Sequence, residues 1–124
     1  MSLDLPELNF RDLFVFDLAN NHQGSVEHGT KIIKEIGAVA KKHGVKAAFK
    51  FQFRQLDTFI HPEHINNLDN KHISRFSSTR LSNEDFKKLL NEVNNLGFYS
   101  MCTPFDEESI DKIIEMNFDF IKVA

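Results

Sequence analysis

The chain has 124 residues, of which 41% are hydrophobic and 27% charged, and its formal net charge is −3. This length is sufficient for one domain with a hydrophobic core, and the slightly acidic balance excludes proteins that bind nucleic acid or anionic membranes through a basic surface. No apolar run approaches the ~20 residues of a membrane span, and Asp4 and Glu7 interrupt the region where a signal peptide would be apolar. The lone Cys102 excludes an internal disulfide and is typical of a reducing, cytoplasmic setting. We therefore expect a cytoplasmic protein without a nucleic-acid or membrane partner.

Apolar strands alternate with amphipathic helices along the chain. After an N-terminal arm over residues 1–12, strands are predicted at 13–19, 45–53, 98–103 and 118–124. The helices between them begin at Ser25, Ser82 and Asp106, which are good N-cap residues. Their apolar residues recur at helical spacing, and the first helix is expected to bury Ile32, Ile33, Ile36, Val39 and Ala40.

Residues 54–81 show no clear periodicity. A segment of this length is a lid-like functional loop, a partly helical segment or a disordered one, and a short helix is possible near 61–68. It contains His61, His64 and His72. Their spacing is weak evidence for a metal site, and we interpret them as solvated loop residues.

The order of elements predicts an α/β protein with a parallel sheet and right-handed crossovers. Two architectures fit: a small, open, doubly wound sheet, or the first half of a (β/α)₈ barrel with its helices outside the strands. A complete barrel needs ~250 residues. In both architectures the functional residues lie at the C-terminal ends of the strands.

Polar residues occur at this end of all four predicted strands. Asp17 is a carboxylate in an apolar strand, where burial without a partner would be costly. Lys50 and Lys122 also interrupt apolar strands, so they are either surface lysines or two cations that converge on a phosphate or carboxylate. Asp17 is then their counter-ion, or it faces a metal or a substrate hydroxyl. Thr103 either places a hydroxyl beside the lysines or simply ends its strand before Pro104.

The segment 20–24 (NNHQG) follows the first strand directly. It is either a plain turn or a polar rim that binds a polyhydroxylated substrate. Within it, His22 can donate or accept a hydrogen bond or ligate a metal. The sequence has no Gly-rich phosphate loop, no nucleophile elbow and no zinc-ligand spacing.

Four segments together resemble the sialic acid synthase (N-acetylneuraminate synthase) family. FDLANNHQG (16–24) resembles the first-strand motif AEIGxNHxG, and FKFQ (49–52) is similar to VKFQ. CTPFD (102–106) is similar to STPFD, and FIKVA (120–124) to FKIAS. The motifs occur in the family's order, each at the C-terminal end of a predicted strand, and the resemblance covers residues 13–124.

The resemblance implies a (β/α)₈ barrel enzyme that condenses phosphoenolpyruvate with an N-acetylated amino sugar such as N-acetylmannosamine. Phosphate is released and a nine-carbon keto acid forms. Members use Mn²⁺ or Mg²⁺ and are homodimers closed by a C-terminal antifreeze-like domain. By position, Lys50, Thr103 and Lys122 would hold phosphoenolpyruvate. Asp17, Lys50 and Lys122 are carried over as catalytic residues, with Asp17 on the side of the sugar or metal.

The resemblance also assigns Asn21, His22 and Gln52 to substrate binding. Two residues depart from the motif: the usual Glu is Asp17, and the usual Gly is Ala19. A shorter acid would suit a different acceptor sugar or metal geometry. The later metal-binding histidines and the closing domain are not among these residues, so we expect no complete metal site.

We therefore expect half of a barrel that has little or no synthase activity alone and that forms a homo-oligomer through its exposed strand edges. The alternative is a self-contained, doubly wound binding or signalling module with an acidic and cationic site at Asp17 and Lys122.

Overall fold

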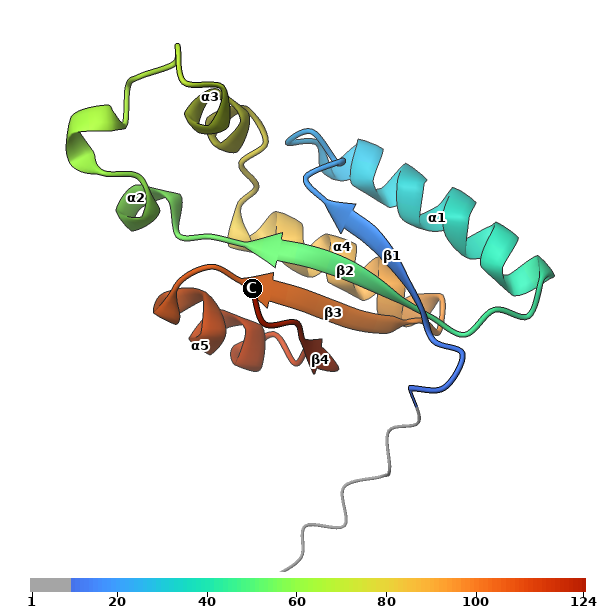
Figure 1. Ribbon diagram of the computed structural model, residues 1–124. Coiled ribbons are helices and arrows are strands. Elements are labelled where there is room, and N and C mark those ends of the chain that lie inside the picture. Colours follow the sequence, from blue (N-terminus) through green and yellow to red (C-terminus); the bar gives the residue numbers. More distant parts are fainter. Residues whose placement is uncertain (1–9) are drawn as a thin grey trace, which may run out of the picture.

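A four-stranded parallel sheet forms the centre of the computed structural model, which describes residues 10–124 (Figure 1). The order across the sheet is β1-β2-β3-β4, the same as the order along the chain. The strands are β1 (Phe14–Ala19), β2 (Ala47–Phe53), β3 (Tyr99–Pro104) and β4 (Phe120–Ile121). The crossover helices are α1 (Val26–Lys42), α4 (Asn83–Asn95) and α5 (Glu107–Glu115). Most of the predicted N-terminal arm lies outside the described residues.

All three predicted N-caps are confirmed. Ser25 accepts a hydrogen bond from the backbone N–H of His28 at 3.1 Å, and Ser82 accepts one from Asp85 at 3.1 Å. Asp106 accepts one from the backbone of Ser109 at 2.8 Å. Each cap satisfies one of the N–H groups that a helix leaves unpaired at its start.

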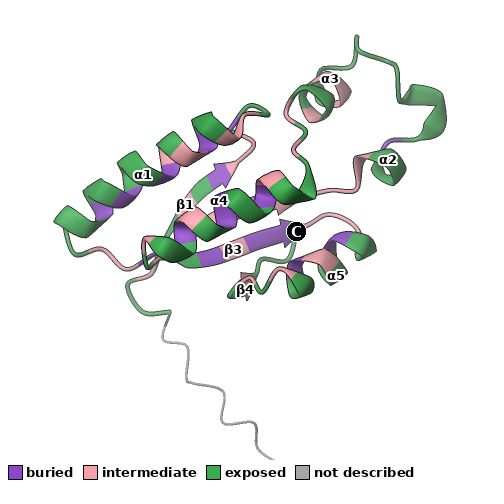
Figure 2. Cartoon of the chain, turned by 180° about the vertical axis from the view of Figure 1, so that it is seen from behind, coloured by how far each residue is buried: buried purple, intermediate pink, exposed green. Residues whose placement is uncertain are grey.

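One face of the sheet carries the hydrophobic core. The phenylalanines of β2 alternate onto this face and pack with apolar residues of the crossover helices. The buried cluster comprises Leu18, Ile33, Phe49, Phe51, Phe53, Phe86, Leu89, Val93, Cys102 and Ile113. Figure 2 shows the matching buried bands along α1 and α4, which alternate with exposed turns.

This arrangement decides between the two predicted architectures. A doubly wound sheet reverses its strand order at a switch point and carries helices on both faces. Here the strand order never reverses, and α1, α4 and α5 contribute to one core on one face. The fold is therefore the first half of a (β/α)₈ barrel, and the doubly wound alternative is wrong.

Several apolar side chains of the helices are exposed at the two margins of the sheet, among them Ile36 and Val39, which the helical spacing predicts to be buried. Ile36 and Val39 of α1 are 37% and 60% exposed, and Ile110 and Ile114 of α5 are 40% and 61% exposed. These segments are helical, as their periodicity predicts, but β1 and β4 are edge strands, so no further βα unit of the described chain covers these positions.

Residues 54–81 form a partly helical segment, one of the three predicted alternatives. It contains α2 (Leu56–Phe59), a 3₁₀ helix (η1, Pro62–His64) and α3 (Lys71–Ser78). In Figure 1, α2 and α3 lie beyond the arrowheads of β1 and β2. The segment therefore stands at the C-terminal end of the strands, where a site is expected.

Strand β4 is shorter than predicted. Its ladder with β3 joins only Met101 to Phe120 and Cys102 to Ile121, so the predicted strand 118–124 contracts to two residues. Within the described part of the chain, no helix is both long and apolar enough to cross a membrane.

Candidate active site

The sheet register brings most of the predicted site residues together. Asp17 is paired with Lys50 across β1 and β2, and Gln52 is paired with Thr103 across β2 and β3. Because the β2 phenylalanines face the helices, Lys50 and Gln52 point to the opposite face, which is the inner face of a barrel. Asp17, Lys50, Gln52 and Thr103 therefore line the concave side of the sheet.

Asp17 and Lys50 form an ion pair on this face. The Lys50 ammonium lies 3.2 Å from a carboxylate oxygen of Asp17, and the two side chains are 18% and 54% exposed. Asp17 is thus not a buried acid, as its apolar strand suggested, because no helix of residues 10–124 covers this side of the sheet. Lys50 is the more shielded partner, and a shielded ammonium attracts anions more strongly than a fully solvated one.

Thr103 and Lys122 occupy different environments. Thr103 is 3% exposed and lies beside Gln52 in the ladder. Lys122 comes one residue after β4, where its backbone N–H donates to the carbonyl of Cys102 at 2.9 Å. Its side chain is exposed and makes no ion pair with another described residue. The structure therefore places Lys122 at the same rim but does not join it to the Asp17–Lys50 pair.

The turn after β1 is held by its own side chains. The Asn21 amide donates to the carbonyl of Asp17 at 3.1 Å, and the Nδ1 atom of His22 accepts from the backbone of Gly24 at 3.0 Å. His22 is only 2% exposed, and burial, with a smaller contribution from His28, lowers its pKa. His22 is therefore a neutral imidazole whose Nε2 atom is left for other partners.

A Mn²⁺ or Mg²⁺ ion has no ready-made cluster of side-chain ligands among the described residues. Residues 10–124 contain no group of three His, Cys, Asp or Glu side chains close enough to hold a metal ion. The hydrogen bond from Gly24 also occupies one nitrogen of His22, which reduces its value as a ligand.

Cys102 has no role as a nucleophile in this structure. The thiol is fully buried in the core, and this burial, opposed only by a backbone hydrogen bond at Thr103, raises its pKa to about 12. Because the thiolate is the reactive form, a thiol with this pKa is inert at neutral pH.

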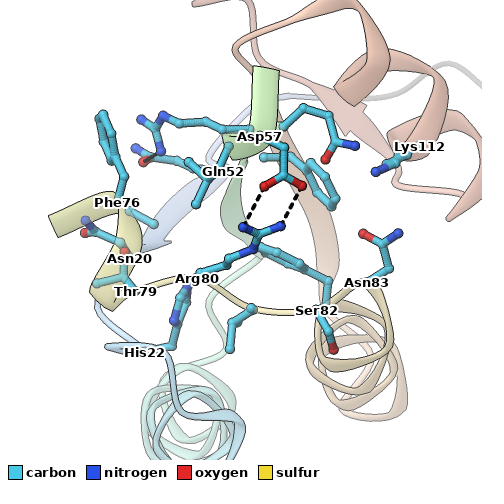
Figure 3. A pocket seen from close by; sticks show the side chains of 17 residues that line it. Asn20, His22, Gln52, Asp57, Phe76, Thr79, Arg80, Ser82, Asn83 and Lys112 are labelled. Carbon is cyan, nitrogen blue, oxygen red and sulfur yellow. Dashed lines mark hydrogen bonds and ion pairs between the residues drawn. The ribbon is translucent and has the colours of Figure 1, made fainter. Parts of the chain in front are cut away.

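A cavity of about 580 Å³ opens beside this face, at the C-terminal ends of β1 and β2 (Figure 3). It is bounded by the turn after β1, by α2 and α3, and by the start of α4. Its polar lining includes Asn20, His22, Gln52, Arg54, Gln55, Asp57, Thr79, Arg80, Ser82, Asn83 and Lys112. Of the predicted site residues, only His22 and Gln52 line it.

Sequence reasoning missed two arginines of this cavity, Arg54 and Arg80. The guanidinium of Arg80 binds both carboxylate oxygens of Asp57, each at 2.9 Å, and this pair crosses the cavity in Figure 3. Arg54 follows β2 directly, two residues after Gln52, and its position at a strand end was the available signal. With Lys112, the lining has three cations and one carboxylate, which suits a polar ligand with negative charge.

Comparison with known proteins gives consistent matches. The NeuB family model matches residues 36–124. The chain is 32% identical over 111 residues to N,N'-diacetyllegionaminic acid synthase of Legionella pneumophila, and the match covers 83% of this chain and 30% of that protein.

Two solved structures are also similar. A Chromobacterium violaceum protein assigned to spore coat polysaccharide biosynthesis (protein E) superposes with a TM-score of 0.88 at 44% identity, over 92% of this chain and 34% of that one. N-acetylneuraminic acid synthetase of Leptospira borgpetersenii superposes with a TM-score of 0.69 at 20% identity, over 91% of this chain and 35% of that one. The second likeness shows a shared fold alone.

The chain spans about 30% of the length of the curated relatives that it matches. The family model nevertheless covers most of the chain and includes the motifs at β2, β3 and β4. The predicted resemblance is therefore confirmed, and the chain belongs to the NeuB family.

Proposed function

We propose that this chain is part of a sugar-acid synthase that condenses phosphoenolpyruvate with an N-acetylated amino sugar, such as N-acetylmannosamine, to a nine-carbon keto acid. Phosphate is released in the reaction. The relative named as N,N'-diacetyllegionaminic acid synthase supports this class. The observation that carries the proposal is the Lys50 ammonium, held 3.2 Å from Asp17 on the concave face beside Gln52 and Thr103.

The concave face has the chemistry that phosphoenolpyruvate requires. The ligand carries a carboxylate and a phosphate, and a lysine offers each of them a compact charge with three hydrogen-bond donors. The Thr103 hydroxyl, which is paired with Gln52 in the ladder, adds a donor, and Lys122 would supply a second cation at the rim. In the unliganded chain, Asp17 neutralises Lys50, so an arriving anion competes with this carboxylate for the ammonium.

The acceptor sugar would occupy the side nearer to β1. Asp17, Asn21, His22 and Gln52 offer acceptors and donors there for hydroxyl and amide groups. The implied Mn²⁺ or Mg²⁺ would need ligands in addition to the described residues.

Lys50 is expected to be essential for binding phosphoenolpyruvate. In calorimetric titrations with and without Mn²⁺, the unsubstituted chain should show saturable binding. Lys50→Ala should weaken this binding at least tenfold, because the shielded cation is lost, whereas Lys42→Ala, at the exposed end of α1, should change it less than twofold. Equal binding by Lys50→Ala and the unsubstituted chain, or no binding by either, would contradict the proposal.

We also propose that the chain self-associates through the two margins of its sheet. Beside β1, Phe14 and Val39 are 56% and 60% exposed, and beside β4, Ile114 and Val123 are 61% and 82% exposed. Exposed edge strands with apolar neighbours pair readily. Sedimentation should therefore show a dimer or larger species that Val39→Glu shifts toward the monomer. A monomer at all concentrations would contradict this proposal.

A further inference from the structure

Arg54 lies between three aromatic rings that come from separate parts of the chain. Its guanidinium carbon is 3.9 Å from the ring centre of Phe105, 4.5 Å from that of Phe76 and 5.9 Å from that of Phe59. Phe59 belongs to α2, Phe76 to α3, and Phe105 follows β3. A guanidinium stacks well on aromatic faces, so this arrangement restricts the plane and position of the Arg54 head group.

The backbone on both sides of Arg54 is also held. The carbonyl of Phe53 accepts from the N–H of Phe105 at 3.1 Å, and the N–H of Gln55 donates to the carboxylate of Asp106 at 2.7 Å. These bonds join the end of β2 to the turn between β3 and α5. Burial lowers the pKa of Arg54, while nearby Asp106 raises it, and the group stays protonated at neutral pH.

Among the described residues, the guanidinium of Arg54 donates a hydrogen bond to Gln52, while its buried Nε atom has no partner. An Nη atom of Arg54 donates to the Oε1 atom of Gln52 at 3.1 Å. Arginine has donors and no acceptor, so only the oxygen of the Gln52 amide can face it. The NH₂ group of this amide must therefore point the other way. Gln52 lines the cavity at the end of β2 (Figure 3). Its NH₂ group has no hydrogen-bond partner among the described residues, so this is the end of the amide that is left for a ligand.

We propose that Arg54 is a positioning residue that fixes the Gln52 amide with its NH₂ group free, so that Gln52 donates a hydrogen bond to an oxygen of the acceptor sugar. The inference rests on the proposed function for the identity of the ligand. It also specifies which kind of group on the sugar Gln52 recognises. Gln52 binds a hydrogen-bond acceptor, such as a hydroxyl or acetyl oxygen, and does not bind a group that can only donate.

The test uses the ¹⁵N-labelled chain and two titrations, one with N-acetylmannosamine and one with phosphoenolpyruvate. The chain has three glutamines, so the side-chain NH₂ signals of Gln52 can be assigned by comparing Gln52→Glu with Gln23→Glu. The sugar is added with and without phosphoenolpyruvate. We expect it to shift the Gln52 NH₂ signals of the unsubstituted chain.

Arg54→Met should raise the Kd for the sugar roughly five- to tenfold, because the Gln52 amide is then free to turn. It should change the Kd for phosphoenolpyruvate less than twofold.

Gln52→Glu is the second variant. Its carboxylate still accepts a hydrogen bond from Arg54, so the fold is kept, but it offers the sugar an oxygen in place of a donor. It should lose sugar binding. Asn91→Asp makes a matching amide-to-acid change on an exposed residue of α4 outside the cavity and should leave both Kd values unchanged.

Two results would overturn the inference: a sugar titration that leaves the Gln52 signals of the unsubstituted chain in place, or an unchanged sugar Kd in Arg54→Met and Gln52→Glu. A role for Arg54 in folding alone would weaken both ligands equally, and this also would overturn it. Failure of the proposed function would show in a different experiment. There, the unsubstituted chain would not bind phosphoenolpyruvate, or Lys50→Ala would bind it equally well.

Discussion

Replacing Phe51 with alanine is expected to lower the free energy of unfolding by about 3–5 kcal/mol. Phe51 is fully buried at the centre of β2, and its ring meets that of Phe118 edge to face at 5.4 Å between ring centres. Removing the ring leaves a cavity between the sheet and the helices, which the close-packed core cannot refill. Small domains are stable by only about 5–15 kcal/mol, so the loss is a large part of the total.

Phe14→Ala is the matched control, because this phenylalanine is on β1 but is 56% exposed at the margin of the sheet. It should cost under about 1 kcal/mol. Urea denaturation followed by circular dichroism measures both variants. Similar losses for the two would show that the core does not lie between the helices and the convex face.

Asp106→Ala is expected to lower the free energy of unfolding by about 2–4 kcal/mol, the sum of a lost N-cap and a backbone N–H left without its partner. One carboxylate oxygen accepts from the backbone and hydroxyl of Ser109 at 2.8 and 2.6 Å. The other accepts from the backbone of Gln55 at 2.7 Å. Asp106 therefore starts α5 and also ties it to the end of β2.

The stabilisation by Asp106 should depend on pH. Burial raises the pKa of this carboxyl, but the hydrogen bonds from Ser109 and Gln55 outweigh burial, and its pKa in the folded chain lies below the usual value. A depressed pKa stabilises the fold above the unfolded pKa of about 3.9, and this contribution is lost as the pH falls through the folded pKa. The difference in unfolding free energy between the unsubstituted chain and Asp106→Ala should thus shrink from pH 6 to pH 2.

Asp111→Ala serves as the control for Asp106, since Asp111 is an exposed acid on the same helix. It should change stability by less than about 0.5 kcal/mol, with no such pH dependence. Two results would show that the tie between α5 and β2 does not stabilise the fold as described. One is an equal loss of unfolding free energy in Asp111→Ala and Asp106→Ala. The other is a difference between the unsubstituted chain and Asp106→Ala that stays constant with pH.

Local signals in the sequence determined the elements and their order. Ser25, Ser82 and Asp106 marked the helix starts because a cap depends on residues within one turn. The apolar alternation of β2 identified its core face for the same reason. The motifs around Asp17, Lys50 and Thr103 indicated the family, and the parallel register places these residues on one face.

Only the tertiary structure decided the surroundings of those residues. Asp17 is exposed and paired because no helix covers the concave face, and Ile36 and Val39 are exposed because β1 is an edge strand. The stacking of Arg54 on Phe105 joins positions that are remote in sequence, as does the bond from Gln55 to Asp106, 51 residues away. Sequence periodicity reports which way a side chain points along its own element, whereas burial, ion pairs and the cavity depend on which other elements lie opposite, and only the folded chain brings those elements together.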